Sequence, residues 1–584
     1  MHRSAKHVPI AAAVLLVAGL ARPVSAQGPL EQPFPPVSSV AGDGITGFRV
    51  NLLRDSTSAV ARAGDLNNDG IDDFIIGAAW PDSSSRYTGA AYVVFGRADG
   101  FPGFIDLIYL DGTTGFRLER DPMGDRVGSS VAPAGDVNGD GIDDVVIGAS
   151  KLASRSQDSG AYVVFGRNGG FPAVVDLGDL GGTAGFRLED IPSSSRQSNE
   201  AGRSVASADV NGDGLNDIIV GAPKASIGTR LEAGITYVVF GRNGGFPAVL
   251  NAGDLDGAFG YRINGVASDD LSGTSIAGAD DVNGDGIDDI IIGAKDARAG
   301  RGEAYVVFGR RGTHPAEVEL SDLDGTDGFR LTTGSHSVAL TEVGVAVAST
   351  DVNGDGLDDV VVGAPGAGPI GSYYGQYNAG QTFVVFGRDY GFPATVTLNE
   401  LHGSTGFRID GDQPIDDSGR SVGPAGDING DGLDDLIIGA EHRGSVHIGY
   451  GYYDRGEGAA YVVFGRKGGF PAVVELSQVD GESSIRIDGT GCCLARSVSG
   501  AGDVNADGSD DVVISNYGRS FVVYGRLAAC RADLDGDGEL TLFDFLVFQN
   551  LFDAGDPLAD FDDDGELTIF DFLAFQNAFA AGCS

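Results

Sequence analysis

Acidic side chains recur along this chain in a nine-residue pattern whose spacing indicates a metal site. In the first copy Asp65, Asn67, Asp69 and Asp73 stand at positions 1, 3, 5 and 9, and Gly70 stands at position 6. Side-chain oxygens at these positions, together with the carbonyl of position 7, form the all-oxygen sphere that suits Ca²⁺ better than octahedral Mg²⁺, and glycine permits the sharp bend between them. The pattern therefore predicts a calcium loop.

The loop occurs seven times, with its first Asp every 70–76 residues. A single loop of this kind is often no more than an Asx turn, but seven filled copies favour metal binding. Carboxylates about 4 Å apart repel each other by about 4 kcal/mol at an effective dielectric near 20, so each loop needs a cation. The predicted ligands, with position 7 contributing its carbonyl, are Asp65, Asn67, Asp69, Ile71, Asp73; Asp136, Asn138, Asp140, Ile142, Asp144; Asp209, Asn211, Asp213, Leu215, Asp217; Asp281, Asn283, Asp285, Ile287, Asp289; Asp351, Asn353, Asp355, Leu357, Asp359; Asp427, Asn429, Asp431, Leu433, Asp435; and Asp503, Asn505, Asp507, Ser509, Asp511.

Position 8 of the loop is also acidic in six of the seven copies. We expect these side chains to face solvent and to add only negative field. They are Asp72, Asp143, Asp288, Asp358, Asp434 and Asp510, with Asn216 in the third copy.

The loops belong to repeats of about seventy residues whose other segments predict short β-strands. Runs such as DVVIGA and AYVVFGR are β-branched or aromatic, end at glycine, and are apolar enough to be buried on both faces. Such units must stack to bury their faces. An isolated GFRV segment (47–50) begins the array, and the last unit ends one strand short at 521–526. We therefore predict a mainly β fold, a seven-bladed propeller over 47–526, which the first segment closes by completing the seventh blade.

The repeats resemble the FG-GAP repeats of the integrin α-chain propeller. GAP stands at 221–223 and 363–365, and related triplets occur in the other units. The resemblance implies calcium loops between the first and second strands of each blade, on the lower face. This chain differs from the integrins because every unit carries a loop and no stalk or membrane anchor follows.

Two near copies, 533–552 and 560–579, follow the repeats and begin with twelve-residue EF-type loops. Their predicted ligands are Asp533, Asp535, Asp537, Glu539 (carbonyl), Asp544, Asp560, Asp562, Asp564, Glu566 (carbonyl) and Asp571. They raise the expected total to about nine calcium ions. Each loop leads into a Phe-rich helix.

These paired copies make 530–584 resemble a dockerin, which implies a cohesin-like or envelope scaffold as partner. The contact residues would be Leu542, Phe543, Ile569 and Phe570, which are apolar where dockerins carry polar residues. The alternative is a calcium-stiffened tail or an export-and-anchoring tag. A Cys530–Cys583 disulfide would bracket this module and stabilise it by roughly 4 kcal/mol. The adjacent Cys492 and Cys493 either pair with each other or remain free thiols.

Export and partner class follow from the ends and the charge of the chain. Residues 1–26 have the basic start, apolar run and small-residue cleavage site of a secretory signal, and 27–46 form a linker. No later stretch is long and apolar enough to span a bilayer. A net charge of −44 opposes binding to nucleic acid. We expect a secreted, cell-surface protein of bacterial origin.

No motif in the chain demands catalysis. The Gly-x-Ser-x-Gly at 419–423 coincides with the first strand of a repeat, since Ser130, Ser275 and Ser497 occupy the same place as Ser421. The histidines beyond the signal are expected at the surface. Long loops after the second strands of units five and six are tyrosine-rich, and they either bind a partner or pack over the blade edge. Their tyrosines are Tyr373, Tyr374, Tyr377, Tyr450, Tyr452 and Tyr453.

The sequence thus predicts a non-enzymatic, calcium-binding propeller that recognises an extracellular protein or glycan and is tethered by its tail. The alternatives are a secreted polysaccharide-degrading lyase or glycosidase and a structural envelope protein.

Overall fold

The computed structural model describes most of the repeat array and parts of the tail. The described residues are 47–52, 59–79, 89–120, 126–150, 159–190, 198–334, 340–368, 379–449, 452–454, 456–481, 483–489, 493–525, 542–554, 559, 568, 571–573, 575–576 and 579.

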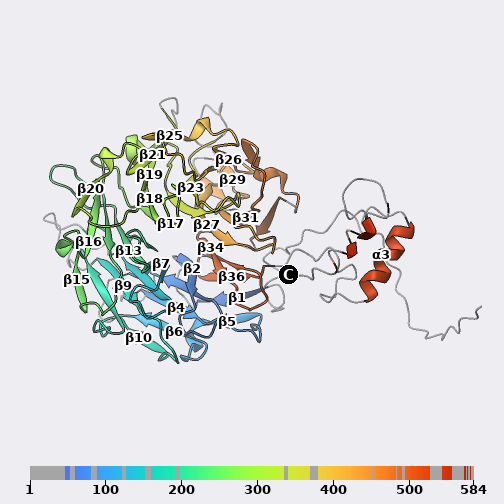
Figure 1. The fold of residues 1–584 in the computed structure, drawn as a ribbon, viewed down its shortest axis with the longest axis horizontal. Helices are drawn as coiled ribbons and strands as arrows, with labels where there is room; N and C mark the ends of the chain where they lie inside the picture. The colour runs from blue at the N-terminus through green and yellow to red at the C-terminus, as the bar shows by residue number, and fades with distance from the viewer. Residues whose placement is uncertain are drawn as a thin grey trace, which may run out of the picture.

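Seven sheets form the blades of a propeller (Figure 1). The antiparallel strands of blades 1 to 4, in chain order, are β2 (Ala59–Gly64), β3 (Asp73–Ala78), β4 (Ala90–Val94), β6 (Gly115–Glu119); β7 (Val127–Gly135), β8 (Asp144–Ala149), β9 (Gly160–Val164), β11 (Gly185–Glu189); β12 (Ser204–Ala208), β13 (Asp217–Ala222), β14 (Ile235–Val239), β16 (Gly260–Asn264); and β17 (Ser275–Ala279), β18 (Asp289–Ala294), β19 (Glu303–Val307), β21 (Gly328–Thr332). Those of blades 5 to 7 are β22 (Ala346–Thr350), β23 (Asp359–Ala364), β24 (Gln381–Val385), β26 (Gly406–Asp410); β27 (Ser418–Gly426), β28 (Asp435–Ala440), β31 (Ala459–Val463), β33 (Ser484–Asp488); and β34 (Val498–Gly502), β35 (Asp511–Asn516), β36 (Arg519–Val523), β1 (Gly47–Asn51).

The first strand of the chain closes the ring, as the sequence predicted. β1 pairs antiparallel with β36, and Gly47 lies opposite Val523. Figure 1 shows these two strands side by side. The N-terminal segment supplies the fourth strand that the seventh unit lacks. The edge of β36 is therefore paired and not exposed.

Short parallel strands, which the sequence analysis did not predict, extend the blades. Each comes from the connection between the third and fourth strands of the following unit, as when Val174 of β10 lies opposite Arg117 of β6. These strands are β5 (Phe104–Asp106), β10 (Val174–Asp176), β15 (Val249–Asn251), β20 (Glu317–Glu319), β25 (Thr395–Thr397) and β32 (Val473–Glu475). Blade 6 has four strands among the described residues, since the unit after it leads into the tail instead.

The cores lie between neighbouring blades. Each second strand is buried along its length, so its near-continuous apolar sequence serves both faces. A Phe from a fourth strand stacks on the Phe of the next unit's connection, as Phe116 does on Phe171 with 4.2 Å between ring centroids. Apolar contact between units therefore stabilises the ring.

A few elements lie outside the blades. They are the hairpin β29 (Val446–Gly449) and β30 (Tyr452–Asp454), the short α2 (Ala297–Gly300), the 3₁₀ turns Leu107–Tyr109, Ala252–Asp254, Leu320–Asp322, Leu398–Glu400 and Leu476–Gln478, and α3 (Leu542–Ala554). Phe548 of α3 stacks on Phe575 in a small cluster of the tail. No helix in the described part of the chain has the length and apolarity of a membrane-crossing segment.

Candidate metal-binding loops

The seven Asp-rich loops lie where the resemblance placed them, between the first and second strands of their blades. The first runs from the end of β2 at Gly64 to the start of β3 at Asp73. The loops bend because polar side chains fold back on their own backbone.

The first Asp of each loop organises the turn. The Asp65 carboxylate accepts the N–H groups of Asp69 and Gly70 at 2.9 and 2.7 Å. The same two contacts recur from Asp136, Asp209, Asp281, Asp351, Asp427 and Asp503. The loop backbone is thus wrapped around one carboxylate.

The ninth-position Asp ties the loop to the third strand. Asp73 is fully buried and accepts the N–H of Leu66 at 3.1 Å and that of Gly96, just after β4, at 2.9 Å. Burial, with a smaller contribution from the carboxylates of Asp69 and Asp65, raises the pKa of Asp73 to about 8. The equivalent Asp144 and Asp435 also have pKa values of about 8, chiefly through burial. The ninth-position carboxyl therefore feels the negative charges of positions 1 and 5 in its own loop.

Two of the predicted ligand residues have buried side-chain oxygens that accept no hydrogen bond. The Oδ1 of Asn67 is buried without a hydrogen-bond partner, as is the Oγ of Ser509 at position 7 of the last loop. In the third loop the amide of Asn211 donates to both oxygens of Asp217, at 3.0 and 3.1 Å. Positions 3 and 9 therefore meet, and a buried oxygen without a donor suits a hard cation. The donor set fits calcium.

The loop side chains are nevertheless not gathered into a closed coordination sphere. Among the described residues, no group of three or more His, Cys, Asp or Glu side chains lies close enough together to hold a metal ion. Calcium binding at these loops therefore stays a prediction.

The prediction that the eighth-position side chains face solvent is wrong. Asp143 Oδ2 accepts the N–H of Asp65, in the loop of the preceding blade, at 2.9 Å. Because the blades stack, each loop lies against the loop of the next blade, and the eighth-position carboxylate of that next blade reaches the backbone N–H of Asp65. Burial raises the pKa of Asp288 and of Asp358 to about 6.

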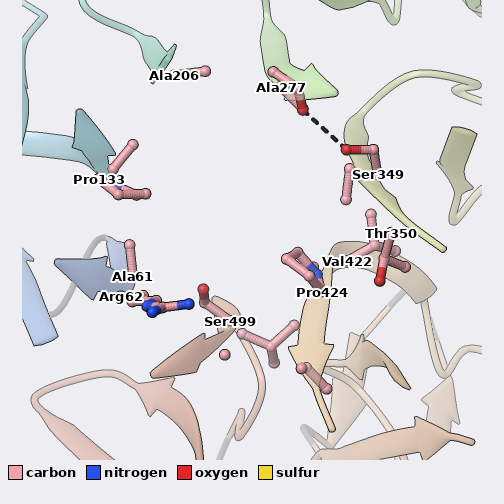
Figure 2. A pocket seen from close by; sticks show the side chains of 18 of the residues that line it. Ala61, Arg62, Pro133, Ala206, Ala277, Ser349, Thr350, Val422, Pro424 and Ser499 are labelled. Carbon is pink, nitrogen blue, oxygen red and sulfur yellow. Dashed lines mark hydrogen bonds between the residues drawn. The ribbon is translucent and has the colours of Figure 1, made fainter. Parts of the chain in front are cut away.

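The first strands surround a central channel of about 590 Å³ (Figure 2). Its wall is mostly small and apolar, including Ala61, Ala206 and Ala277, and Ser349 Oγ donates to the Gly278 carbonyl at 3.0 Å. Arg62 reaches into the channel and pairs with Asp72 at 2.8 Å. The sequence alone does not reveal this channel, because its wall comes from seven distant strands.

The Gly-x-Ser-x-Gly segment lies within β27, as predicted. Ser421 Oγ accepts the N–H of Val498 from the neighbouring blade at 3.1 Å. Its hydroxyl thus joins two blades.

Two histidines are half-buried, although we expected them at the surface. The His314 ring stacks on Tyr261 with 5.2 Å between centroids, in the place where other units stack two Phe rings. His442 hydrogen-bonds Asp417 at 2.9 Å, and this bond raises the pKa of His442. Equivalence between repeats could have located His314, whereas nothing in the sequence pairs His442 with Asp417.

The base of the long loop after β28 is held by Arg443. Its guanidinium contacts Asp412 at 2.9 Å and Asp488 at 3.2 Å, and it donates to the Tyr461 hydroxyl at 2.9 Å. Three elements thus fix where this loop leaves the blade.

Several predicted site residues lie outside the part of the structure that can be described. For the loop tyrosines this holds for Tyr373, Tyr374, Tyr377 and Tyr450, and for the side chains of Tyr452 and Tyr453. For the tail it holds for Asp533, Asp535, Asp537, Glu539, Asp560, Asp562, Asp564, Glu566, Ile569, Phe570, Cys530 and Cys583, and for the side chains of Leu542, Phe543 and Asp544. Asp571 is buried and accepts the N–H of Thr568 at 2.6 Å. Cys493 is in a disulfide, so it is not a free thiol.

An exposed apolar patch, formed by Phe104, Ile108 and Tyr109, was missed by the sequence analysis. The three side chains are 54%, 54% and 74% exposed. A cavity of about 270 Å³, lined by Phe101, Phe104 and Tyr109 among others, lies beside them. A comparison of the repeats could have located this patch, because the second unit carries the smaller or polar residues Val174, Gly178 and Asp179 at the equivalent positions.

Comparison with known proteins gives matches within the repeats. Six segments match the FG-GAP repeat family: 57–94, 127–164, 201–239, 272–307, 343–385 and 418–463. Phosphatidylinositol-glycan-specific phospholipase D of Bos taurus is 38% identical over 136 residues, which are 23% of this chain and 14% of that protein. Integrin alpha pat-2 of Caenorhabditis elegans is 30% identical over 244 residues, 41% of this chain and 18% of that protein.

Integrin alpha-5 of Xenopus laevis is 28% identical over 247 residues, 41% of this chain and 20% of that protein. The chain therefore matches no more than a fifth of the length of these relatives. The solved structure of the Dos1 propeller aligns with 82% of this chain and with 95% of its own chain, at 11% sequence identity and a TM-score of 0.34. The seven sheets make this chain a seven-bladed β-propeller, and six of its repeats are similar to the FG-GAP repeat.

Proposed function

We propose that this chain is a secreted, calcium-stabilised propeller that recognises an extracellular protein. The integrin α relatives share its repeats, and the phospholipase relative shares a segment that is 14% of its length. The proposal assigns binding, and no catalytic step, to the propeller.

Calcium would be held by the loop oxygens at positions 1, 3, 5 and 9 and by the carbonyl at position 7. Its chemistry is structural, because a divalent cation offsets the repulsion among the three carboxylates of a loop. The chain's own part is to hold those oxygens. Position 1 fixes the turn through two backbone N–H groups, and position 9 anchors the turn to the third strand.

Recognition is carried by the patch of Phe104, Ile108 and Tyr109. Large exposed apolar side chains that gather beside a cavity mark interaction sites more often than isolated ones do. Aromatic residues are also enriched at the centres of protein interfaces. The patch lies on β5 and the 3₁₀ turn Leu107–Tyr109, at the outer edge of the closing blade. Its apolar character favours a protein partner over a sugar.

The tail is proposed as the tether. Support comes from its two near-identical EF-type loops and from the Phe548–Phe575 stack, which gives it a small core of its own. Its partner would be a cohesin-like or envelope scaffold.

The recognition proposal is tested by giving the patch the residues of the second unit, Phe104→Val, Ile108→Gly and Tyr109→Asp. Proteins captured from the producer's extracellular and envelope fractions by the native chain and by this variant are compared by mass spectrometry. Leu231→Ser is the matched control, since Leu231 is 62% exposed elsewhere on the propeller.

We expect one protein or a small set to be retained by the native chain and by the control but lost from the variant, with melting unchanged. Equal capture by all three chains would overturn the patch as the recognition surface. Loss after glycosidase treatment of the fraction, but not after protease treatment, would assign the ligand to glycans instead.

A further inference from the structure

Eighth-position residues link each Asp-rich loop to the loop of the preceding blade, and at six of the seven junctions the link is made by the side chain. Four junctions share one hydrogen bond, from the backbone N–H of a loop's first Asp to the eighth-position Oδ2 of the next blade. The pairs are Asp65 with Asp143 at 2.9 Å, Asp209 with Asp288 at 2.7 Å, Asp427 with Asp510 at 2.9 Å, and Asp503 with Asp72 at 3.2 Å. The last pair crosses the closure of the ring.

The other three junctions connect neighbouring loops through different hydrogen bonds. Asp358 Oδ2 accepts the N–H of Asp280, one residue before the fourth loop, at 2.9 Å. Thr350 Oγ1 donates to Asp434 Oδ2 at 3.2 Å. In the third blade, the backbone N–H of Asn216 donates to the Asp136 carbonyl at 3.2 Å.

Backbone shape at the junctions is adapted to this contact. Gly64, which precedes Asp65, has φ +72°, and a Cβ there would lie 2.3 Å from Asp143 Oδ2. Gly426 and Gly502 stand in the same relation to Asp510 and Asp72, with a Cβ 2.2 Å from the carboxylate oxygen in each case. At these positions any other residue would displace the eighth-position carboxylate.

We propose that the eighth-position side chain is a positioning residue for the calcium loop of the preceding blade, and that it couples calcium binding between neighbouring blades. The inference rests on the proposed calcium function. Position 8 is followed directly by position 9, which is a calcium ligand of its own loop. When calcium orders that loop, it also fixes the eighth-position oxygen that accepts a hydrogen bond from the loop of the preceding blade. That acceptor holds the backbone of the neighbour's first ligand. The coupling is reciprocal, as linkage requires.

The test is a calcium titration of the full chain followed by hydrogen exchange and mass spectrometry, which gives a midpoint calcium concentration for each loop. The variants are Asp143→Ala, which removes the acceptor, and Asp143→Asn, which keeps an oxygen there as the natural Asn216 does. Asp510→Ala repeats the test at another junction, in case one variant fails to fold.

In Asp143→Ala we expect the midpoint of loop 65–73 to rise roughly five- to tenfold, and that of its own loop 136–144 to rise less. Asp143→Asn should restore most of the native midpoint at 65–73. Asp510→Ala should act in the same way on loop 427–435.

The coupling is overturned if only one of the two loops 65–73 and 136–144 shifts, if all seven loops shift equally, or if the Asn variant behaves like Ala. A native chain in which calcium changes exchange in no loop would instead overturn the calcium proposal, and the coupling with it. The two failures are therefore distinguishable.

Discussion

Phe48 in the first strand of the propeller lies opposite Val522 in β36, and its ring stacks on Phe101 with 4.2 Å between centroids. One residue near the N-terminal end of the ring thus joins the seventh blade to the connection of the first. Phe48 is fully buried. We therefore expect closure of the propeller to depend on this contact.

Substituting Phe48→Ala should cost about 3–5 kcal/mol of unfolding free energy through the cavity it leaves. Hydrogen exchange should rise most in 484–525 and 101–106, and less in 59–97, where Phe74 packs against Phe48 with 6.0 Å between ring centroids. Deleting residues up to Val50 should have the same effect in stronger form. The matched control is Phe116→Ala, which removes the equivalent ring of blade 1. Loss of protection at 59–97 instead of 484–525 after the Phe48 change would contradict the closing role of β1.

Removing calcium should lower the melting temperature sharply. Each ion present at one hundred times its dissociation constant adds about 2.7 kcal/mol to the stability of the folded chain. Differential scanning calorimetry in calcium, in excess chelator and in magnesium alone measures the effect. Chelation should lower the melting temperature more than Asp73→Ala does, since that change removes a ligand from only one loop. Identical melting curves with and without chelator would refute the prediction.

His314→Phe should stabilise the propeller by about 1 kcal/mol, because it restores the ring found in the other stacks and removes a buried Nε2 without a partner. Burial, together with the Arg310 charge, lowers the pKa of His314 below 6.5. The unfolded chain therefore binds more protons at this site below about pH 6.5, so native stability at this site falls as the pH falls through that range. Melting temperatures of the native chain and the variant should diverge between about pH 7 and pH 5. Parallel curves would contradict the assignment.

The tail should act separately from the propeller. Changing Leu542, Phe543, Ile569 and Phe570 to Asp should abolish retention at the producer's surface and leave the calcium-dependent melting of the propeller unchanged. Surface retention is measured by cell fractionation and melting by calorimetry on the same chains. A variant that stays at the surface, or one whose propeller melts earlier, would refute this division.

The sequence by itself determined the features that depend on local spacing. Ligand types at positions 1, 3, 5 and 9 locate the seven loops, and short β-branched runs ending at glycine locate the long strands. The closing role of the segment before Asn51 could also be predicted from the sequence, because the seventh repeat lacks a fourth strand and this N-terminal segment is a strand without a repeat of its own.

Only the tertiary structure decided which distant residues meet. Asp143 looks like a solvated acid in the sequence, and it becomes a hydrogen-bond acceptor because blade stacking brings it to Asp65. Strands of three residues such as β5 are too short to recognise, and they exist because the neighbouring blade offers an edge. The same holds for Phe104 and Tyr109, whose exposure at one edge depends on how the connection folds over the closing blade. Contacts between blades depend on the geometry of the whole ring, and this geometry cannot be deduced from a short stretch of sequence.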